Sequence, residues 1–284
     1  MTWFGGVTRV SSLRAAVLWL AAAAPVAAQQ QESPAPIADN SFLIEEAFNQ
    51  ERGVVQHIST FARPDGGRAW AYSFTQEWPL SGMRHQLSYT VPLQHEETAG
   101  TGLGDVGLNY RYQLVGVDGG SIFVAPRLSL LFPTGSELKN RGAGGAGLQV
   151  NLPVSLTPAT GLALHANAGA TWTRTARSAL GDESATLSTN AGASVIWLPL
   201  PSFNLLVELL WYGTESVVAQ DVTLREDTWL LNPGVRWAFN FPSGLQIVPG
   251  AAYTVGLTDG GEGDGLFLYL SFEHPFKRYP AEEP

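Results

Sequence analysis

The chain has 284 residues, of which 45% are hydrophobic and only 14% are charged, and its formal net charge is −9. Soluble domains usually carry about 25% charged residues, so the outside of this protein is expected to be poor in charge. The absence of cysteine excludes disulfides, thiol nucleophiles and thiolate metal sites. The excess of acidic groups argues against nucleic acid as a partner.

The first 28 residues have the pattern of a secretory signal peptide. Arg9 and Arg14 precede the apolar run AAVLWLAAAAPVAA, and Val26 and Ala28 occupy the positions where a signal peptidase requires small residues. We expect residues 1–28 to be removed, so that the mature chain begins at Gln29. This cleavage takes away two arginines and no acid, which changes the net charge from −9 to −11. Residues 29–53 are then a periplasmic N-terminal segment.

Within that segment, the apolar residues of 41–50 recur at helical spacing, which predicts a short helix ending at Gly53. We expect this helix either to plug or line the mouth of a barrel, or to lie against the rim of the barrel. Its plug candidates are Leu43, Ile44 and Phe48, which share one helical face with Ala47, while Glu45, Glu46 and Asn49 lie opposite.

From residue 54 onward the sequence divides into about twelve segments with period-two alternation of apolar and polar residues. Their lengths match the ~9–11 residues that a tilted transmembrane strand needs. The predicted strands are 54–63, 69–79, 84–95, 104–115, 121–133, 145–157, 161–174, 185–199, 202–213, 227–241, 244–257 and 265–276.

The connections between these segments alternate between tight turns and longer polar loops. PLSG, VDGG and PATG are examples of the tight turns, and TGSELKNRGAGG and GTESVVAQDVTLRED are examples of the long loops. Short turns at one rim and long loops at the other are typical of up-and-down outer-membrane barrels. An even number of strands places both termini at the short-turn, periplasmic rim.

The stretch GLGDVGLNYRYQL, residues 102–114, shows which face meets which medium. Every second residue from Val106 to Leu114 is apolar or aromatic, whereas Asn109, Arg111 and Gln113 alternate with them. A soluble sandwich with this alternation would need a charged exterior, for which the chain has too little charge. We therefore predict an all-β fold, a transmembrane up-and-down antiparallel β-barrel over residues 54–276, with a short N-terminal helix and a periplasmic tail at 277–284.

The same stretch and the block NSFLIEEAFNQERGVVQHI resemble the outer-membrane transporters grouped with the phenol-degradation meta-pathway proteins. The resemblance covers roughly residues 40–276. It implies an outer-membrane barrel that moves small, often hydrophobic, molecules. It implies no catalytic residue and identifies no substrate.

Strand parity points a set of charged side chains into the lumen, and these are the constriction candidates. The VDGG turn brings Arg111 almost directly across a hairpin from Arg127, and two adjacent guanidiniums repel unless a carboxylate or a solute anion lies between them. Two interpretations remain: an ion-pair network that fills a narrow barrel, or a solute-selective constriction. The candidates are Glu77, Arg111, Arg127, Glu208, Arg236 and Glu273.

The sequence favours a passive outer-membrane channel for small molecules, hydrophobic or aromatic ones included. The alternatives are a structural or plugged barrel without transport, and an outer-membrane lipase-type enzyme, for which only His57 and Ser59 form a close Ser/His pair. The scattered histidines predict no metal site and no cofactor is expected. The expected partners are outer-membrane lipid, the small solute, and the barrel-assembly machinery. Phe276 ends the last predicted strand like the aromatic signal that this machinery reads, but it departs from that signal because KRYPAEEP follows it.

Overall fold

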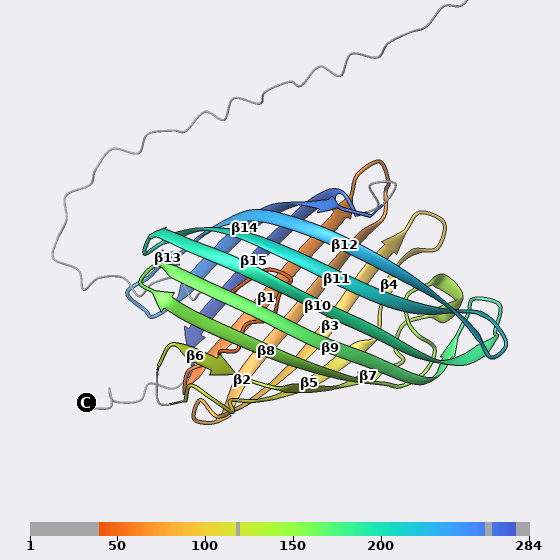
Figure 1. The fold of residues 1–284 in the computed structure, drawn as a ribbon, viewed down its shortest axis with the longest axis horizontal. Coiled ribbons are helices and arrows are strands. Elements are labelled where there is room, and N and C mark those ends of the chain that lie inside the picture. Colours follow the sequence, from red (N-terminus) through yellow and green to blue (C-terminus); the bar gives the residue numbers. More distant parts are fainter. Residues whose placement is uncertain (1–39, 118–119, 259–262, 277–284) are drawn as a thin grey trace, which may run out of the picture. The chain divides into compact units, whose positions relative to one another are not determined.

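The computed structural model describes residues 40–117, 120–258 and 263–276, so the predicted signal peptide, the cleavage site and the 277–284 tail lie outside the described residues. The described chain is almost entirely β-strand (Figure 1), together with one 3-10 turn, Glu137–Lys139. Among the described residues, no helix is long and apolar enough to cross a membrane.

The strand segments pair only with antiparallel neighbours, and β1 pairs with β15, so that the sheet closes on itself. Three pairs of successive segments each form one barrel strand, because both members pair with the same neighbour: β4 and β5 with β3, β6 and β7 with β8, and β12 and β13 with β14. The result is a closed antiparallel barrel of 12 strands, as the sequence predicts.

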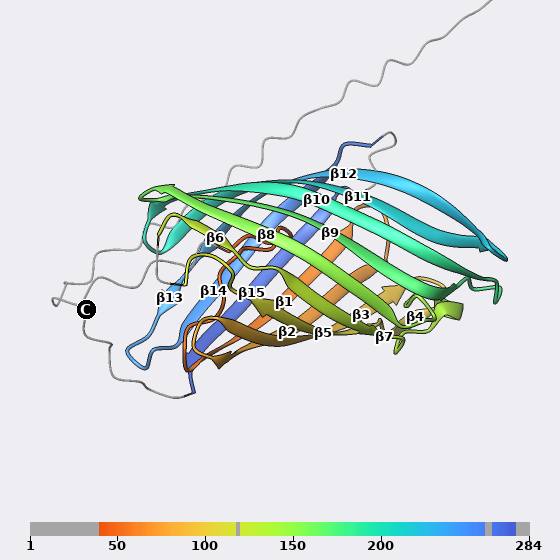
Figure 2. The same ribbon diagram turned by 60° about the horizontal axis from the view of Figure 1, so that its bottom comes forward.

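The strands follow the chain in simple up-and-down order, and Figures 1 and 2 show them tilted around a common lumen. Their bounds are β1 Val54–Pro64, β2 Trp70–Ser81, β3 His85–Glu96, β4 Gly100–Leu103, β5 Val106–Tyr112, β6 Ile122–Val124, β7 Arg127–Phe132, β8 Gly147–Ala159, β9 Leu162–Arg177, β10 Glu183–Leu200, β11 Phe203–Ala219, β12 Val222–Trp237, β13 Phe239–Asn240, β14 Gln246–Gly256 and β15 Gly265–Pro275.

Burial in this barrel is the reverse of that in a soluble protein. Leu108 and Val207 are 38% and 46% exposed on the outside, whereas Glu208 and Arg236 are 0% and 1% exposed. A wall with an apolar outer surface and a polar interior is what the hydrocarbon of a membrane selects. The predicted parity of the strands is therefore confirmed.

Two connections expected to be long loops are short in the structure. Only residues 97–99 separate β3 from β4, and only residues 220–221 separate β11 from β12. At the latter turn Asp221 has a φ of 58°, a left-handed conformation that aspartate tolerates better than most residues. Residues 213–227 thus extend the β11–β12 hairpin, which reaches beyond most other strands in Figures 1 and 2.

The helix predicted for residues 41–50 is not formed, and this stretch consists of bends and irregular chain instead. Its backbone groups are bound by side chains of the barrel wall, which replace the hydrogen bonds that a helix would make within itself. An isolated helix of ten residues is marginal on its own, so these outside partners decide the conformation. The last strand and the first residues of the barrel meet at one rim, where the Phe276 N–H donates to the Gly53 carbonyl (2.8 Å).

Candidate functional site: a chain segment bound inside the barrel

Residues 40–50, called here the lumen segment, lie inside the barrel and are largely buried, with Ala47 and Ile44 only 0% and 2% exposed. The segment precedes β1 directly, so its C-terminal end is tied to the rim that carries the short turns. Its contacts reach strands on several sides of the lumen, among them β1, β3, β8, β11 and β15. The lumen segment thus crosses the bore as a separate piece of chain.

The carboxylate of Glu208 in β11 is the main anchor of the first half of the segment. Its Oε1 accepts hydrogen bonds from three consecutive backbone N–H groups, those of Phe42 (3.0 Å), Leu43 (2.7 Å) and Ile44 (2.9 Å). Its Oε2 accepts one from the side chain of Asn232 (2.7 Å). Hydrogen bonds to a charged acceptor are stronger than neutral ones, so this one side chain fixes the path of three residues.

In the second half, neutral side chains of the wall bind the backbone N–H groups of three residues. Backbone N–H groups of Ala47, Asn49 and Gln50 donate to Ser155 Oγ (2.8 Å), Gln113 Oε1 (3.0 Å) and Gln86 Oε1 (2.7 Å), respectively. The amide of Gln113 also donates to the Ala47 carbonyl (2.7 Å). Glutamine and serine thus stand in for the hydrogen bonds that a strand or helix partner would supply.

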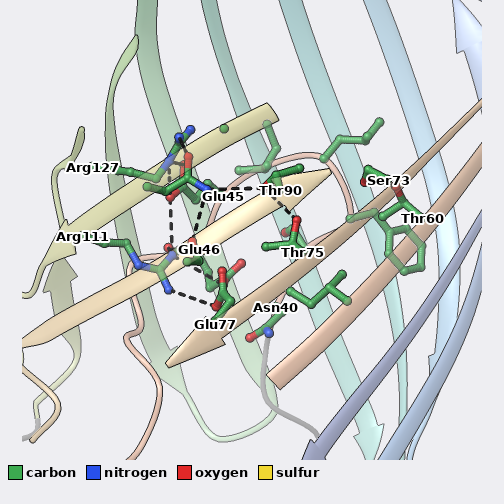
Figure 3. Close-up of a pocket in the computed structure, with 18 of the residues that line it drawn as sticks. Asn40, Glu45, Glu46, Thr60, Ser73, Thr75, Glu77, Thr90, Arg111 and Arg127 are labelled. Carbon is green, nitrogen blue, oxygen red and sulfur yellow. Dashed lines mark hydrogen bonds and ion pairs between the residues drawn. The ribbon is translucent and has the colours of Figure 1, made fainter. Parts of the chain in front are cut away.

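Arg111 and Arg127, directly paired across β5 and β7, receive their counter-charge from the lumen segment. Figure 3 shows Glu45 between them: Arg127 Nε lies 2.9 Å from both Glu45 oxygens, and Arg111 Nη1 lies 3.5 Å from Glu45 Oε1. Glu46 and Glu77 are 3.7 and 3.8 Å from the Arg111 guanidinium. Arg111 also donates to the carbonyls of Glu46 (3.0 Å) and Phe48 (2.5 Å).

The two acids of the lumen segment have opposite electrostatic surroundings. Burial by itself raises the pKa of Glu45, but Arg127 and Arg111 outweigh it and lower that pKa below its usual range. Burial raises the pKa of Glu46 to about 7, because its interaction with Arg111 compensates only in part and Glu77 repels its charge. Glu45 is therefore held as a carboxylate, whereas Glu46 changes protonation near neutral pH.

The remaining lumen candidates lie apart from this cluster. Arg236 is buried, and its Nε donates a hydrogen bond to Asn204 Oδ1 (3.3 Å). The Arg236 guanidinium lies over the Phe42 ring. Glu273 Oε1 accepts a hydrogen bond from Gln56 Nε2 (2.6 Å), and Gln56 Oε1 accepts one from Gln50 Nε2 (2.5 Å). The structure thus brings Glu77, Arg111 and Arg127 together and leaves Glu208, Arg236 and Glu273 at separate contacts with or near the segment.

The plug candidates have distinct surroundings because the segment is not helical. Ile44 is buried against the wall at Gly192, and the Phe48 ring lies edge-on to Phe123, with ring centroids 4.6 Å apart. Leu43 packs against the apolar cluster of the lumen. Sequence reasoning missed Glu45 and Glu46 as lumen residues. The signal that could have found them is the Arg111–Arg127 pair, because two adjacent guanidiniums require a carboxylate between them and β5 and β7 supply none.

A cavity of about 410 Å³ lies over the lumen segment, on the side of the long loops. The segment from Asn40 to Glu46 forms its floor, and Figure 3 shows hydroxyl-bearing side chains of β1, β2 and β3 on its wall. Several of these hydroxyls bond each other in pairs, namely Thr60 with Ser73 (2.7 Å) and Thr75 with Thr90 (2.9 Å). The cavity is thus a polar vestibule that stops at the segment.

The described residues offer little for catalysis or metal binding. His57 and Ser59 do not form a dyad, since Ser59 bonds Tyr72 and His57 bonds His274. Ser155 Oγ lies 2.7 Å from His165 Nδ1 in the lumen, but the lumen segment covers this pair through its Ala47 N–H. Across residues 40–117, 120–258 and 263–276, no three histidine, aspartate or glutamate side chains are grouped as metal ligands.

Solved barrels with low sequence identity share this fold. The COG4313 outer membrane channel from Pseudomonas putida F1 matches with a TM-score of 0.60 and 12% identity, over 80% of this chain and 97% of that one. The NanC porin matches with a TM-score of 0.52 and 11% identity, over 79% of this chain and 100% of that one. No curated protein sequence matches the chain.

The family model described as "Putative MetA-pathway of phenol degradation" matches residues 27–270, which is most of the chain. This match agrees with the resemblance seen in the stretches around Asn40 and Gly102. The chain belongs to this family.

Proposed function

We propose that the protein is an outer-membrane channel for the passive passage of small molecules, and that the described conformation is its closed state. In this proposal the lumen segment is the plug. The solved barrels of the same fold include an outer membrane channel and a porin, which supports a channel over an enzyme.

The observation that carries the proposal is how the bore is closed. A purely structural barrel would fill its lumen with side chains of its own wall, as small barrels do. Here a length of chain tied to the rim fills it, held by side-chain hydrogen bonds from Glu208, Gln113 and Ser155 rather than by pairing with a strand. These contacts can be released without breaking any rung of the barrel.

Arg111 and Arg127 act in this proposal as the plug's receptors in the closed state. Once the segment leaves, their two charges line the bore without Glu45, and they would then favour anionic or polarised solutes in the open state. The ion-pair interpretation and the constriction interpretation therefore describe two states of the same residues.

Single-channel recording of the mature chain in a planar bilayer tests the proposal. We expect rare openings for the unmodified chain and frequent, discrete openings after Glu208→Gln, which keeps the shape of the anchor but removes its charge. A chain lacking residues 41–50 should be open most of the time. Silence of all three proteins, with β-barrel content intact by circular dichroism, would refute channel function and favour a structural barrel.

A further inference from the structure

The side chain of Phe42 occupies a recess in the lumen wall, called here the Phe42 pocket. The Phe42 ring centroid lies 5.4 Å from that of Phe267 and 5.3 Å from that of Tyr269, both in β15, with the rings tilted. The Arg236 guanidinium carbon lies 5.8 Å from the Phe42 ring centroid and 5.9 Å from that of Tyr269. The pocket is formed by Gly234, Arg236, Gly250, Ala252, Phe267 and Tyr269.

The pocket exists because two positions of the wall have no side chain. A Cβ atom at Gly250 would lie 2.7 Å from the Phe42 ring, and one at Gly234 would lie 2.5 Å from it. Glycine weakens a strand interior, and where it occurs there it often marks the close approach of a ligand or another chain. The wall of β12 and β14 is therefore shaped to admit a flat ring.

The surroundings of this ring suit an aromatic group more than a saturated one. Tilted rings at these centroid distances attract each other through their quadrupoles. A guanidinium over the ring face adds a cation–π interaction, which is stronger where water is excluded. A saturated ring of the same size would fill the space but would make neither contact.

The Phe42 pocket borders the vestibule. Both Phe42 and Tyr269 line the 410 Å³ cavity, which lies on the side of the long loops. A solute that enters the cavity therefore meets the edge of this pocket at the floor, where the lumen segment begins.

We propose that Phe42 occupies a subsite for the ring of a single-ring aromatic solute, and that such a solute competes with the lumen segment for it. This inference rests on the proposed channel function, and it names both the solute class and the event that favours opening. Phe42 competes with the solute for the pocket, because its phenyl ring makes the contacts that the ring of the solute makes when the segment has left.

Release of the segment can be followed with a single introduced thiol, because the chain has no cysteine of its own. Ser41→Cys places it next to Phe42, at a position that is 5% exposed. We expect benzyl alcohol to raise the rate of labelling by a water-soluble maleimide several-fold, and cyclohexylmethanol, its saturated counterpart, to have little effect. Equal acceleration by both alcohols, or by neither, would overturn the proposal.

Direct binding of benzyl alcohol to the detergent-solubilised chain supplies the second measurement. Phe42→Ala should bind it at least tenfold more tightly than the unmodified chain, because the competing ring is gone. Phe48→Ala is the matched control, since the same side chain is removed from the same segment outside the pocket, and it should bind like the unmodified chain. Adding Gly250→Val to Phe42→Ala refills the pocket and should abolish the gain.

These results separate the two proposals. Selective labelling and binding together with silence in bilayers would refute channel function and leave the subsite in place. Conductance without any preference for the aromatic alcohol would support the channel and refute the subsite. Equal binding of benzyl alcohol by Phe42→Ala and by the double variant Phe42→Ala with Gly250→Val would also refute the subsite.

Discussion

Arg111 and Arg127 are paired residue to residue across β5 and β7, and the carboxylate that they share, that of Glu45, comes from neither strand. Glu45 comes from the lumen segment, 66 positions before Arg111. Without the segment, Arg111 keeps only the more distant Glu77 of β2, at 3.8 Å, and Arg127 loses its 2.9 Å ion pair with Glu45 in the described chain. Loss of the segment has an electrostatic cost, and that cost contributes to holding the bore closed.

Replacing Glu45 with glutamine should release the segment. The change removes the carboxylate between the buried Arg111 and the partly buried Arg127, and breaking a buried ion pair from one side costs on the order of 3–5 kcal/mol. We expect faster labelling of a Ser41→Cys thiol and more frequent openings. Glu46→Gln is the matched control, because the Glu46 carboxylate pairs with Arg111, at 3.7 Å, and does not bridge the two arginines in the described chain, and it should change both readouts much less. Equal effects of the two changes would contradict this account.

Binding of the segment should weaken as the pH rises from about 4.5 to about 7. Docking raises the pKa of Glu46 from its usual 4.5 to about 7, so the docked state holds a proton that the released segment loses within this interval. The groups facing Glu46 are Arg111, Glu77 and Glu45. The opening frequency should increase over this interval, and Glu46→Gln should flatten the increase. A profile unchanged by Glu46→Gln would assign the titration to another acid.

The outer face of the barrel is testable by introducing charge. Leu108→Arg places a guanidinium on the lipid face, at a cost of roughly 2–4 kcal/mol near the bilayer midplane. Gln149→Arg places the same side chain in the water-accessible vestibule, where we expect a much smaller loss. Urea unfolding of both variants in lipid vesicles measures the difference. Similar losses would show that the outer wall does not face lipid.

Export should remove residues 1–28. The mature chain is then expected to begin at Gln29 and to fractionate with the outer membrane. Intact-mass analysis of the protein recovered from membranes checks the cleavage site directly. Retention of the first 28 residues, or recovery from a soluble fraction, would contradict the prediction.

The strands were predictable because the alternation of apolar and polar residues within each strand shows which face meets lipid and which meets the lumen. In β5 the alternation of Leu108 and Tyr110 with Asn109 and Arg111 is a local pattern, and neither face needs a distant residue to be recognised. Beyond the membrane this signal fades. Residues 213–227 read as a polar loop, since strands of the β11–β12 hairpin that project into water need no apolar outer face.

The path of the lumen segment could not be predicted for the opposite reason. Its helical spacing is real, but the partners of its N–H groups are Glu208, Ser155 and Gln113, which lie 64 to 166 positions away along the chain. Sequence periodicity contains no information about such contacts. Only the repulsion expected between Arg111 and Arg127 hinted that an acid from elsewhere would join them.

The attachment of the lumen segment at one rim also bears on how the barrel is assembled. The segment is joined to the wall only through residues 51–53, beside the seam where β1 meets β15. Its other described end, at Asn40, belongs to no barrel strand, so the segment can enter the bore after the seam has closed, with no strand having to shift its register. Barrel closure and plug insertion are separable steps, and a chain caught between them would be a complete, leaky barrel rather than a misfolded one.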